Sequence, residues 1–421
     1  MSANWFGETF EVRVDGPAHG GFCVGRRDGR VVFVRHTLPG ELVLVRVTED
    51  PGKSFCRADA VEVLDPSPDR IPARCPISGP GASGCCDFSH VTPGALRVIK
   101  STVVREQLAK IAQIDREVTV EALPGRDDGT QWRSRVRLAV DDTGRAGFHR
   151  FRSSRLVTDL RCPQVVPGLY DELGDASWRP DSELHVVVDS TGTRHVVESS
   201  AAQSRTARTD RGRRGAAARR AGASGPRRHR VLEGTGRPVE RVGARDWELD
   251  ATGFWQAHTG AADRYSDVVR NWSGALSGAT AWDLYCGVGV FASVLADQVG
   301  PHGSVVGAEF SRQAVVDGRA ALDDLPQVSL YSGRVERMFD RLPSNPSVVV
   351  LDPPRSGAGR DVVAGVSAAG AGALVHIGCD PAAFARDAGL YEQAGYRLTE
   401  LRAFDAFPLT HHVEVIGLFT R

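Results

Sequence analysis

The sequence predicts an α/β protein in which a doubly wound, mostly parallel sheet follows a small β-barrel and a mixed α+β central domain. Its 421 residues exceed one ordinary domain, and 41% hydrophobic with 25% charged residues is typical of a soluble globular protein. The residue pattern changes near residues 64 and 241, which divides the chain into blocks 1–64, 65–241 and 242–421.

The first block alternates apolar and polar residues in short runs. Turn-forming pairs such as Asp28-Gly29 and Pro39-Gly40 separate the runs. A closed barrel of the OB kind is expected, a scaffold that often binds oligonucleotides. From the pattern alone, RNA binding and simple stabilisation of the next block are equally good interpretations. The expected strands are 8–14, 21–26, 30–34, 41–49 and 55–64.

The central block begins with a Pro-rich, cysteine-containing segment and continues with a helix expected at 93–114. Strands are expected at 132–140, 146–151 and 183–188. Between 205 and 230 there are ten Arg and a single acid, Asp210. Such a run predicts a loop. We favour a solvated insertion over a specific RNA clamp, although its charge attracts phosphates.

The third block alternates apolar strands with helical stretches at 289–299 and 311–323, which predicts the doubly wound sheet. The segments 395–404 and 412–420 are expected to close it as a strand pair. The other expected strands are 281–285, 304–309, 328–332, 348–351 and 373–377.

Charge and targeting signals exclude several classes of protein. The chain carries 52 basic and 52 acidic residues, so its bulk charge indicates no partner. Eight cysteines are spread thinly, unlike those of a disulfide-stapled secreted domain. Neither a signal peptide nor an apolar run long enough for a membrane helix is visible. We expect a cytoplasmic protein that does not bind membranes.

A glycine-rich turn after an apolar strand indicates a cofactor site. Gly287 and Gly289 lie in Asp283-Leu-Tyr-Cys-Gly-Val-Gly, where a ligand can approach bare backbone. Glu309 ends the next expected strand, 22 residues after Gly287, at the spacing of an acid that binds ribose hydroxyls. Alone, this pattern also fits a nicotinamide site or a turn without a ligand.

Two further turns follow neighbouring strands. Asp352-Pro-Pro-Arg355 resembles the substrate-base loop of nucleic-acid methyltransferases, which dehydrogenases do not need. Cys379 precedes an expected helix at 382–395, whose dipole lowers a thiol pKa. Its polar neighbours favour a reactive thiol over a buried one.

Glu414 lies in an apolar strand, where an acid is either paired or functional. Methylation of carbon 5 of uracil explains this set of residues. A thiolate that adds to carbon 6 makes carbon 5 nucleophilic, and a base must later remove the carbon 5 proton.

Together these motifs resemble the RNA uracil-C5 methyltransferase family over nearly the whole chain. The resemblance implies a class I (Rossmann-like) methyltransferase domain and an N-terminal TRAM domain. It further implies a monomer that methylates tRNA or rRNA with S-adenosylmethionine, with Cys379 as nucleophile and Glu414 as base. The implied cofactor-binding residues are Gln256, Tyr285, Gly287, Gly289, Glu309 and Asp352.

Two departures from the family pattern concern the cofactor. Val290 stands where Asn is frequent, and Arg334 stands where Asp or Asn is usual. Many members also hold a four-iron, four-sulfur cluster through four cysteines. Here Ser83 occupies one ligand position, but four thiols remain. We expect a cluster, against a degenerate or zinc-filled site, with ligands Cys75, Cys85, Cys86 and Cys162.

Two other functions compete with uracil-C5 methylation. A methyltransferase acting on an exocyclic amine would use Asp352 but would need no nucleophilic Cys379. A non-catalytic RNA-binding protein with a decayed methyltransferase domain would fit Val290 and Arg334. Intact Cys379, Glu414 and Asp352 argue against decay.

Overall fold

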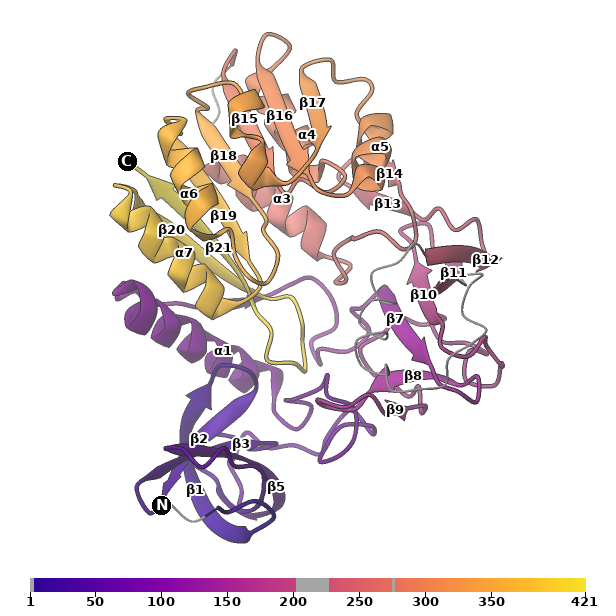
Figure 1. Ribbon diagram of the computed structural model, residues 1–421, viewed down its shortest axis with the longest axis vertical. Helices are drawn as coiled ribbons and strands as arrows, with labels where there is room; N and C mark the ends of the chain where they lie inside the picture. The colour runs from indigo at the N-terminus through magenta and orange to yellow at the C-terminus, as the bar shows by residue number, and fades with distance from the viewer. Residues whose placement is uncertain (1–3, 202–226, 275–276) are drawn as a thin grey trace, which may run out of the picture.

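The computed structural model describes residues 4–201, 227–274 and 277–421. Figure 1 shows the barrel at one end, the C-terminal sheet with its helices at the other, and the central sheet beside them. Among the described helices, none has the length and apolar character needed to cross a membrane.

The first block forms a closed barrel with strand order β1-β2-β3-β5-β4. Phe10, Val12 and Val14 of β1 are buried while their neighbours are exposed, because successive side chains of a strand point to opposite faces. All five expected strands are confirmed. They are β1 (Thr9–Ala18), β2 (Phe22–Arg27), β3 (Arg30–Arg35), β4 (Leu42–Glu49) and β5 (Phe55–Asp65).

The central block contributes an antiparallel sheet with the order β12-β11-β10-β7-β8-β9. The strands expected near 132–140, 146–151 and 183–188 are confirmed as β7, β8 and β10. The bounds are β7 (Arg135–Val140), β8 (Ala146–His149), β9 (Leu156–Val157), β10 (Glu183–Val188), β11 (Arg194–Ala201) and β12 (Arg227–Glu233).

Most of the Arg-rich run, 205–226, lies outside the described residues. The expectation of a loop is wrong for its last four residues, which open β12 and pair with β11. Arg227 also forms an ion pair with Glu183 of β10. Because β12 is an edge strand with exposed side chains, a strongly polar sequence can form it without burying charge.

The third block contains the sheet β17-β16-β15-β18-β19-β21-β20-β6. Strands β15 to β19 are parallel and β21 is antiparallel to β19, as in a Rossmann-like methyltransferase fold. The strands are β15 (Thr280–Leu284), β16 (Ser304–Glu309), β17 (Val328–Ser332), β18 (Val348–Leu351), β19 (Ala373–Gly378), β20 (Arg397–Asp405) and β21 (Glu414–Thr420).

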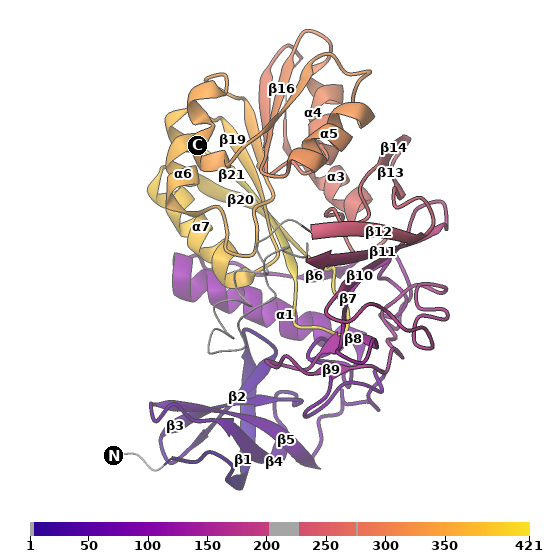
Figure 2. The same ribbon diagram turned by 45° about the vertical axis from the view of Figure 1, so that its right-hand side comes forward.

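Helices cover both faces of this sheet, as Figure 2 shows, and one apolar core lies under each set. One face carries α3 (Ala261–Trp272), α4 (Val290–Val299) and α5 (Arg312–Ala321). The other carries α6 (Gly359–Ala368), α7 (Pro381–Gln393) and α1 (Pro93–Gln107). Short elements complete the described chain: η1 (Leu108–Ala112), β13 (Val239–Val242), β14 (Arg245–Glu248), η2 (Val335–Arg337) and η3 (Phe339–Arg341).

Part of the central block joins the C-terminal sheet. The helix expected at 93–114 is α1 followed by the π-helical turn η1, and β6 (Val120–Ala122) pairs in parallel with β20. Val104 and Leu108 lie in the same core as Phe384 of α7. The domain division at 241 stays a prediction. The C-terminal sheet crosses it, because β6 is one of its strands and α1 buries its apolar side against α7.

Candidate active site

The glycine loop connects β15 to α4 at the carboxyl edge of the sheet. Tyr285, Gly287 and Gly289 all have positive φ, so the backbone turns sharply there. A Cβ placed on Gly287 would meet no atom within 4 Å, which shows open space beside the loop. The loop is held from behind, because the amides of Tyr285 and Cys286 donate to the Ala308 carbonyl of β16 at 2.8 and 3.1 Å.

Two carboxylates face this loop. Glu309 accepts the Gly287 amide through Oε2 at 3.2 Å and the Ser311 amide through Oε1 at 2.6 Å. Asp283 is fully buried, and its Oδ2 accepts the Ala292 amide at 2.8 Å while its Oδ1 has no hydrogen-bond partner. An unpartnered buried oxygen and open space beside bare backbone fit a polar ligand such as S-adenosylmethionine.

Tyr285 belongs to this loop, and Gln256 is connected to it through the packing of its neighbour Trp255. Trp255, next to Gln256, packs against Trp247, whose indole donates to the Val288 carbonyl of the loop at 3.1 Å. Tyr285 continues β15 into the loop, half-buried against the core on the α6–α7 face. Their contacts with a cofactor stay predictions.

The two departures from the family pattern have clear positions. Val290 is the first residue of α4, and Arg334 precedes η2 with its guanidinium 5.5 Å from the exposed Phe310 ring. Because Phe310 directly follows Glu309, this cation–π pair stands beside the carboxylate expected to bind ribose. An altered affinity for the cofactor stays a prediction.

Cys379 and Glu414 are brought together by strand register. Gly378 of β19 pairs with Val415 of β21 in an antiparallel ladder. Cys379, which follows Gly378, therefore lies beside Glu414, which precedes Val415. Cys379 is half-buried, whereas Glu414 is 3% exposed. Asp352 follows β18, the neighbour of β19, and its amide donates to the Leu284 carbonyl at 3.3 Å. The three side chains expected to perform the chemistry therefore gather at one edge of the sheet.

Burial and mutual repulsion raise the pKa of every acid in this cluster. Burial and the Glu309 charge raise the pKa of Asp352 to about 7, and burial and Asp352 raise the pKa of Glu414 well above its usual value. Arg355 opposes the shift at Glu414. Burial at this edge of the sheet therefore favours the uncharged forms of these acids.

The expectation of a lowered pKa for Cys379 is wrong. Burial raises the pKa of its thiol to about 12, and the Glu414 and Asp352 charges add to the shift. The helix does begin just beyond it, since Asp380 caps α7 by accepting the Ala383 amide at 2.8 Å. The cap satisfies that amide, so burial and two carboxylates outweigh the helix dipole at the thiol.

Tyr265 of α3 was not expected in the site. Its side chain is fully buried, its hydroxyl has no hydrogen-bond partner, and its ring packs 5.8 Å from Phe404. Phe404 is the cross-strand partner of Glu414. Burial raises the pKa of the Tyr265 phenol well above its usual value, and the Glu414 charge is the next largest cause. A lone Tyr in an amphipathic helix carries no sequence signal that separates it from core packing.

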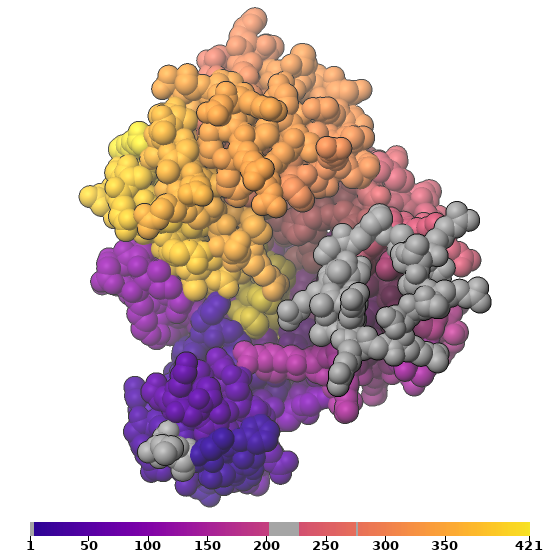
Figure 3. Space-filling view, viewed as in Figure 1, coloured from indigo at the N-terminus to yellow at the C-terminus, as the bar shows by residue number. Residues whose placement is uncertain are grey.

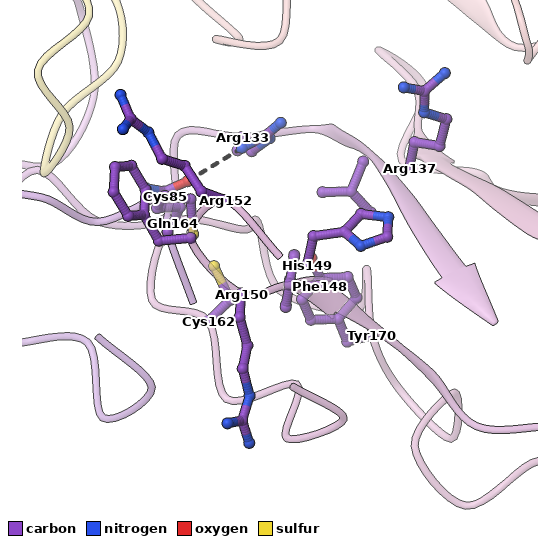
Figure 4. Close-up of a pocket in the computed structure, with 13 residues that line it drawn as sticks. Cys85, Arg133, Arg137, Phe148, His149, Arg150, Arg152, Cys162, Gln164 and Tyr170 are labelled. Atoms are coloured by element: carbon purple, nitrogen blue, oxygen red, sulfur yellow. Dashed lines mark hydrogen bonds between the residues drawn. The ribbon is translucent and has the colours of Figure 1, made fainter. Parts of the chain in front are cut away.

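The cysteine loop, defined here by Cys75, Cys85, Cys86 and Cys162, lies between the barrel and the central sheet. Cys86 Sγ accepts from Gln164 Nε2 at 3.1 Å, and the Cys75 and Cys85 thiols hydrogen-bond with Cys86. Figure 4 shows Cys85 and Cys162 lining a cavity of about 320 Å³ with Arg133, Gln164 and Tyr170. The sequence thus brings these four thiols to one region.

The cysteine loop does not form a ready site for a single metal ion. Within the described ranges, no group of three or more His, Cys, Asp or Glu side chains has the arrangement needed to hold one. Cys85 and Cys86 are adjacent in the chain, and Ser83 Oγ lies 3.4 Å from Cys85 Sγ in the position that a further thiol would need. The four-iron, four-sulfur cluster stays a prediction.

The fold and this edge of the sheet define an S-adenosylmethionine-dependent methyltransferase of the Rossmann-like class. The glycine loop, the acid at the end of the second strand, and the Asp-Pro-Pro turn after the fourth occupy their expected places around open space.

Comparison with known proteins narrows the class to one family. Residues 6–60 match the TRAM domain, and residues 335–421 match the tRNA (Uracil-5-)-methyltransferase family. The chain is 41% identical to an RNA methyltransferase from Corynebacterium glutamicum, over 99% of this chain and 97% of that protein. It is 31% identical to the 23S rRNA (uracil(1939)-C(5))-methyltransferase RlmD of Alkalilimnicola ehrlichii, over 98% and 97%. The chain belongs to the RNA uracil-C5 methyltransferase family.

One solved structure shares the whole architecture. The Pyrococcus abyssi tRNA (uracil-54, C5)-methyltransferase, solved with S-adenosyl-L-homocysteine, matches with a TM-score of 0.68 and 19% identity. The match covers 98% of this chain and all of that chain. At this identity the likeness concerns the fold, which agrees with the barrel and the Rossmann-like sheet described above.

Proposed function

We propose that this protein transfers a methyl group from S-adenosylmethionine to carbon 5 of a uridine in RNA, through a covalent bond between Cys379 and carbon 6. The observation that carries the proposal is the register that places Cys379 opposite Glu414, with Asp352 on the adjoining strand. A methyltransferase acting on an exocyclic amine needs neither the thiol nor a second acid beside it.

The chemistry follows from three groups of this chain. The Cys379 thiolate adds to carbon 6, and the electrons of the 5,6 double bond move to carbon 5 and the carbon 4 oxygen. S-adenosylmethionine supplies the electrophilic methyl group and a positive charge. Once carbon 5 carries the methyl group, the Glu414 carboxylate removes its proton. The double bond re-forms and the thiolate leaves.

The proposed roles need the ionised forms of Cys379 and Glu414, whereas burial raises the pKa of each. A cation bound near Asp352 favours the ionised forms of these acids. Arg355 already provides one such charge to Cys379 and Glu414.

The RNA is proposed to be ribosomal. The relative that methylates 23S rRNA aligns with nearly all of this chain, and the barrel matches the TRAM model. The cysteine loop is proposed to hold a four-iron, four-sulfur cluster through Cys75, Cys85, Cys86 and Cys162. We expect the protein to act in the cytoplasm as a monomer.

Trapping with 5-fluorouridine RNA tests the proposed reaction. Fluorine at carbon 5 cannot leave as a proton, so the enzyme should remain bonded to the RNA and migrate as a shifted band on a denaturing gel. Cys379→Ala should form no such band while it still binds S-adenosylmethionine. Cys56→Ala, which removes a barrel thiol far from the site, is the matched control. An equal band from the Cys379→Ala protein would contradict the proposal.

A further inference from the structure

The β1–β2 hairpin of the barrel reaches the methyltransferase sheet. At its tip, His19 Nε2 lies 3.2 Å from Asp380 Oδ2. Asp380 directly follows Cys379, and its other carboxylate oxygen caps α7. A residue of the barrel therefore holds the residue next to the proposed nucleophile, across an interface between sequence-distant blocks.

A second contact connects the barrel to the segment 407–413, which precedes Glu414. Arg35 of β3 donates to Asp87 Oδ1 at 2.9 Å, and His411 Nδ1 lies 2.5 Å from Asp87 Oδ2. The Phe88 amide donates to the Leu409 carbonyl at 3.0 Å. One carboxylate thus joins the barrel to a segment that ends at the proposed base.

Close packing fixes the hairpin against this carboxylate. Gly21 has φ +83°, and a Cβ there would lie 2.8 Å from Asp87 Cγ. Arg35 and Asp87 are 3% and 2% exposed, so their charge-assisted hydrogen bond is shielded from water. Burial by itself would raise the pKa of Asp87, but His411 and Arg35 outweigh it and hold that pKa below its usual value.

The opposite end of the same segment is also fixed. Lys100 of α1 is 1% exposed and donates to Asp405 at 2.5 Å and to the Phe407 carbonyl at 3.1 Å. The segment is therefore held by α1 at one end and, through Asp87, by the barrel near the other. Figure 3 shows the barrel as a lobe at the lower end of the molecule, in contact with the rest along its upper side.

We propose that the TRAM barrel positions both catalytic segments, with His19, Gly21 and Arg35 as positioning residues, and so sets the rate of the chemical step. The proposal rests on the roles assigned to Cys379 and Glu414. A barrel that only bound RNA would affect affinity and leave the rate at saturating RNA unchanged. These contacts predict that barrel variants lower the saturating rate more than the RNA affinity, because small displacements of reacting groups greatly slow a reaction.

Single-turnover methylation at saturating RNA and S-adenosylmethionine tests this, together with the RNA Kd of each variant. His19→Ala and Arg35→Gln should lower the saturating rate about tenfold or more, since a displacement of about 1 Å can cost about 10²-fold. Their RNA Kd should change less than the rate. His19→Gln, which can still donate to Asp380, should recover most of the rate.

Arg46→Gln is the matched control, because Arg46 is an exposed cation of β4 that lies outside the hairpin. Its saturating rate should stay at the wild-type value, whether or not the lost charge weakens RNA binding. If Arg35→Gln fails to fold, the partly exposed His19 still provides the test, with thermal unfolding as the check on folding.

A wild-type saturating rate in His19→Ala would overturn the proposal. The wild-type protein must form the 5-fluorouridine adduct in the same preparation. If it forms none, the proposed reaction has failed. If it does and His19→Ala reacts at the same rate, only the positioning role has failed.

Discussion

The catalytic edge and the cysteine loop both gather thiols and charges, yet they shift thiol pKa values in opposite directions. Burial, Glu414 and Asp352 raise the pKa of Cys379 to about 12. At Cys85, hydrogen bonds from Cys86 and Ser83 outweigh burial and lower the thiol pKa to about 6. The charge of Arg133 adds to this effect.

The comparison shows that a position before a helix is not enough to lower the pKa of a thiol. Cys379 precedes a helix of 13 residues, a position expected to favour the thiolate, and yet it stays protonated. Cys85 lies in a loop, and its pKa is lowered by hydrogen bonds from its chain neighbours Cys86 and Ser83 and by the charge of the distant Arg133. Hydrogen-bond donors and nearby charges therefore decide the pKa of each thiol.

Glu414→Gln should have the largest effect on the catalytic edge. Addition of Cys379 and methyl transfer precede proton loss, so the variant should stall as a methylated covalent adduct with ordinary uridine RNA. Turnover should fall by about 10²–10⁴-fold, the usual contribution of a general base. A denaturing gel measures the covalent adduct, and a methylation assay measures the turnover. A loss well under tenfold, with no adduct, would mean that Glu414 is a buried structural acid.

The pH dependence of adduct formation checks the raised pKa of Cys379. Because only the thiolate reacts and its pKa is about 12, the rate with 5-fluorouridine RNA should rise about tenfold per pH unit between pH 7 and 9. A lowered thiol pKa would give a flat profile over that range. Quenched reactions on a denaturing gel measure it, and a plateau from pH 7 upward would contradict the assignment.

Anaerobic purification tests the cysteine loop. If all four thiols bind, the protein should be brown and contain about four iron atoms per chain. Cys86→Ser should lose that iron and Cys56→Ser should keep it, since Cys56 belongs to the barrel core. Iron analysis and the visible spectrum measure the cluster content of each protein. Colourless wild-type protein, with zinc or without metal, would show that the loop is a packed thiol cluster.

Tyr265→Phe should have the smallest effect and act on stability. The substitution removes a buried hydroxyl that has no hydrogen-bond partner, so the free energy of unfolding should rise by about 1 kcal/mol. Denaturant unfolding measures it, with Tyr396→Phe as control because the Tyr396 hydroxyl donates to the Ala371 carbonyl at 2.9 Å. A destabilised Tyr265→Phe protein would show that the hydroxyl has a partner in solution.

Local pattern was sufficient for most of the fold. Period-two alternation located the barrel strands, and apolar runs followed by polar turns located the parallel sheet with Asp352 and Cys379 at its carboxyl edge. Strand β12 does not follow from local pattern, because an Arg-rich edge strand lacks the apolar face that marks a strand in a sequence. The membership of β6 in the C-terminal sheet was missed for a related reason, since three residues carry too little pattern.

The sequence by itself was enough to predict the residues proposed for the chemistry, because a thiol, an acid and a glycine turn each follow a recognisable pattern at a strand end. Only the tertiary structure decided their ionisation and their supports. Strand register opposes Cys379 and Glu414, Tyr265 of α3 packs against Phe404, the cross-strand partner of Glu414, and His19 and Arg35 approach from the barrel. Such contacts join segments that are well separated in the sequence. They depend on burial and distance in the folded chain, which one-dimensional spacing does not encode.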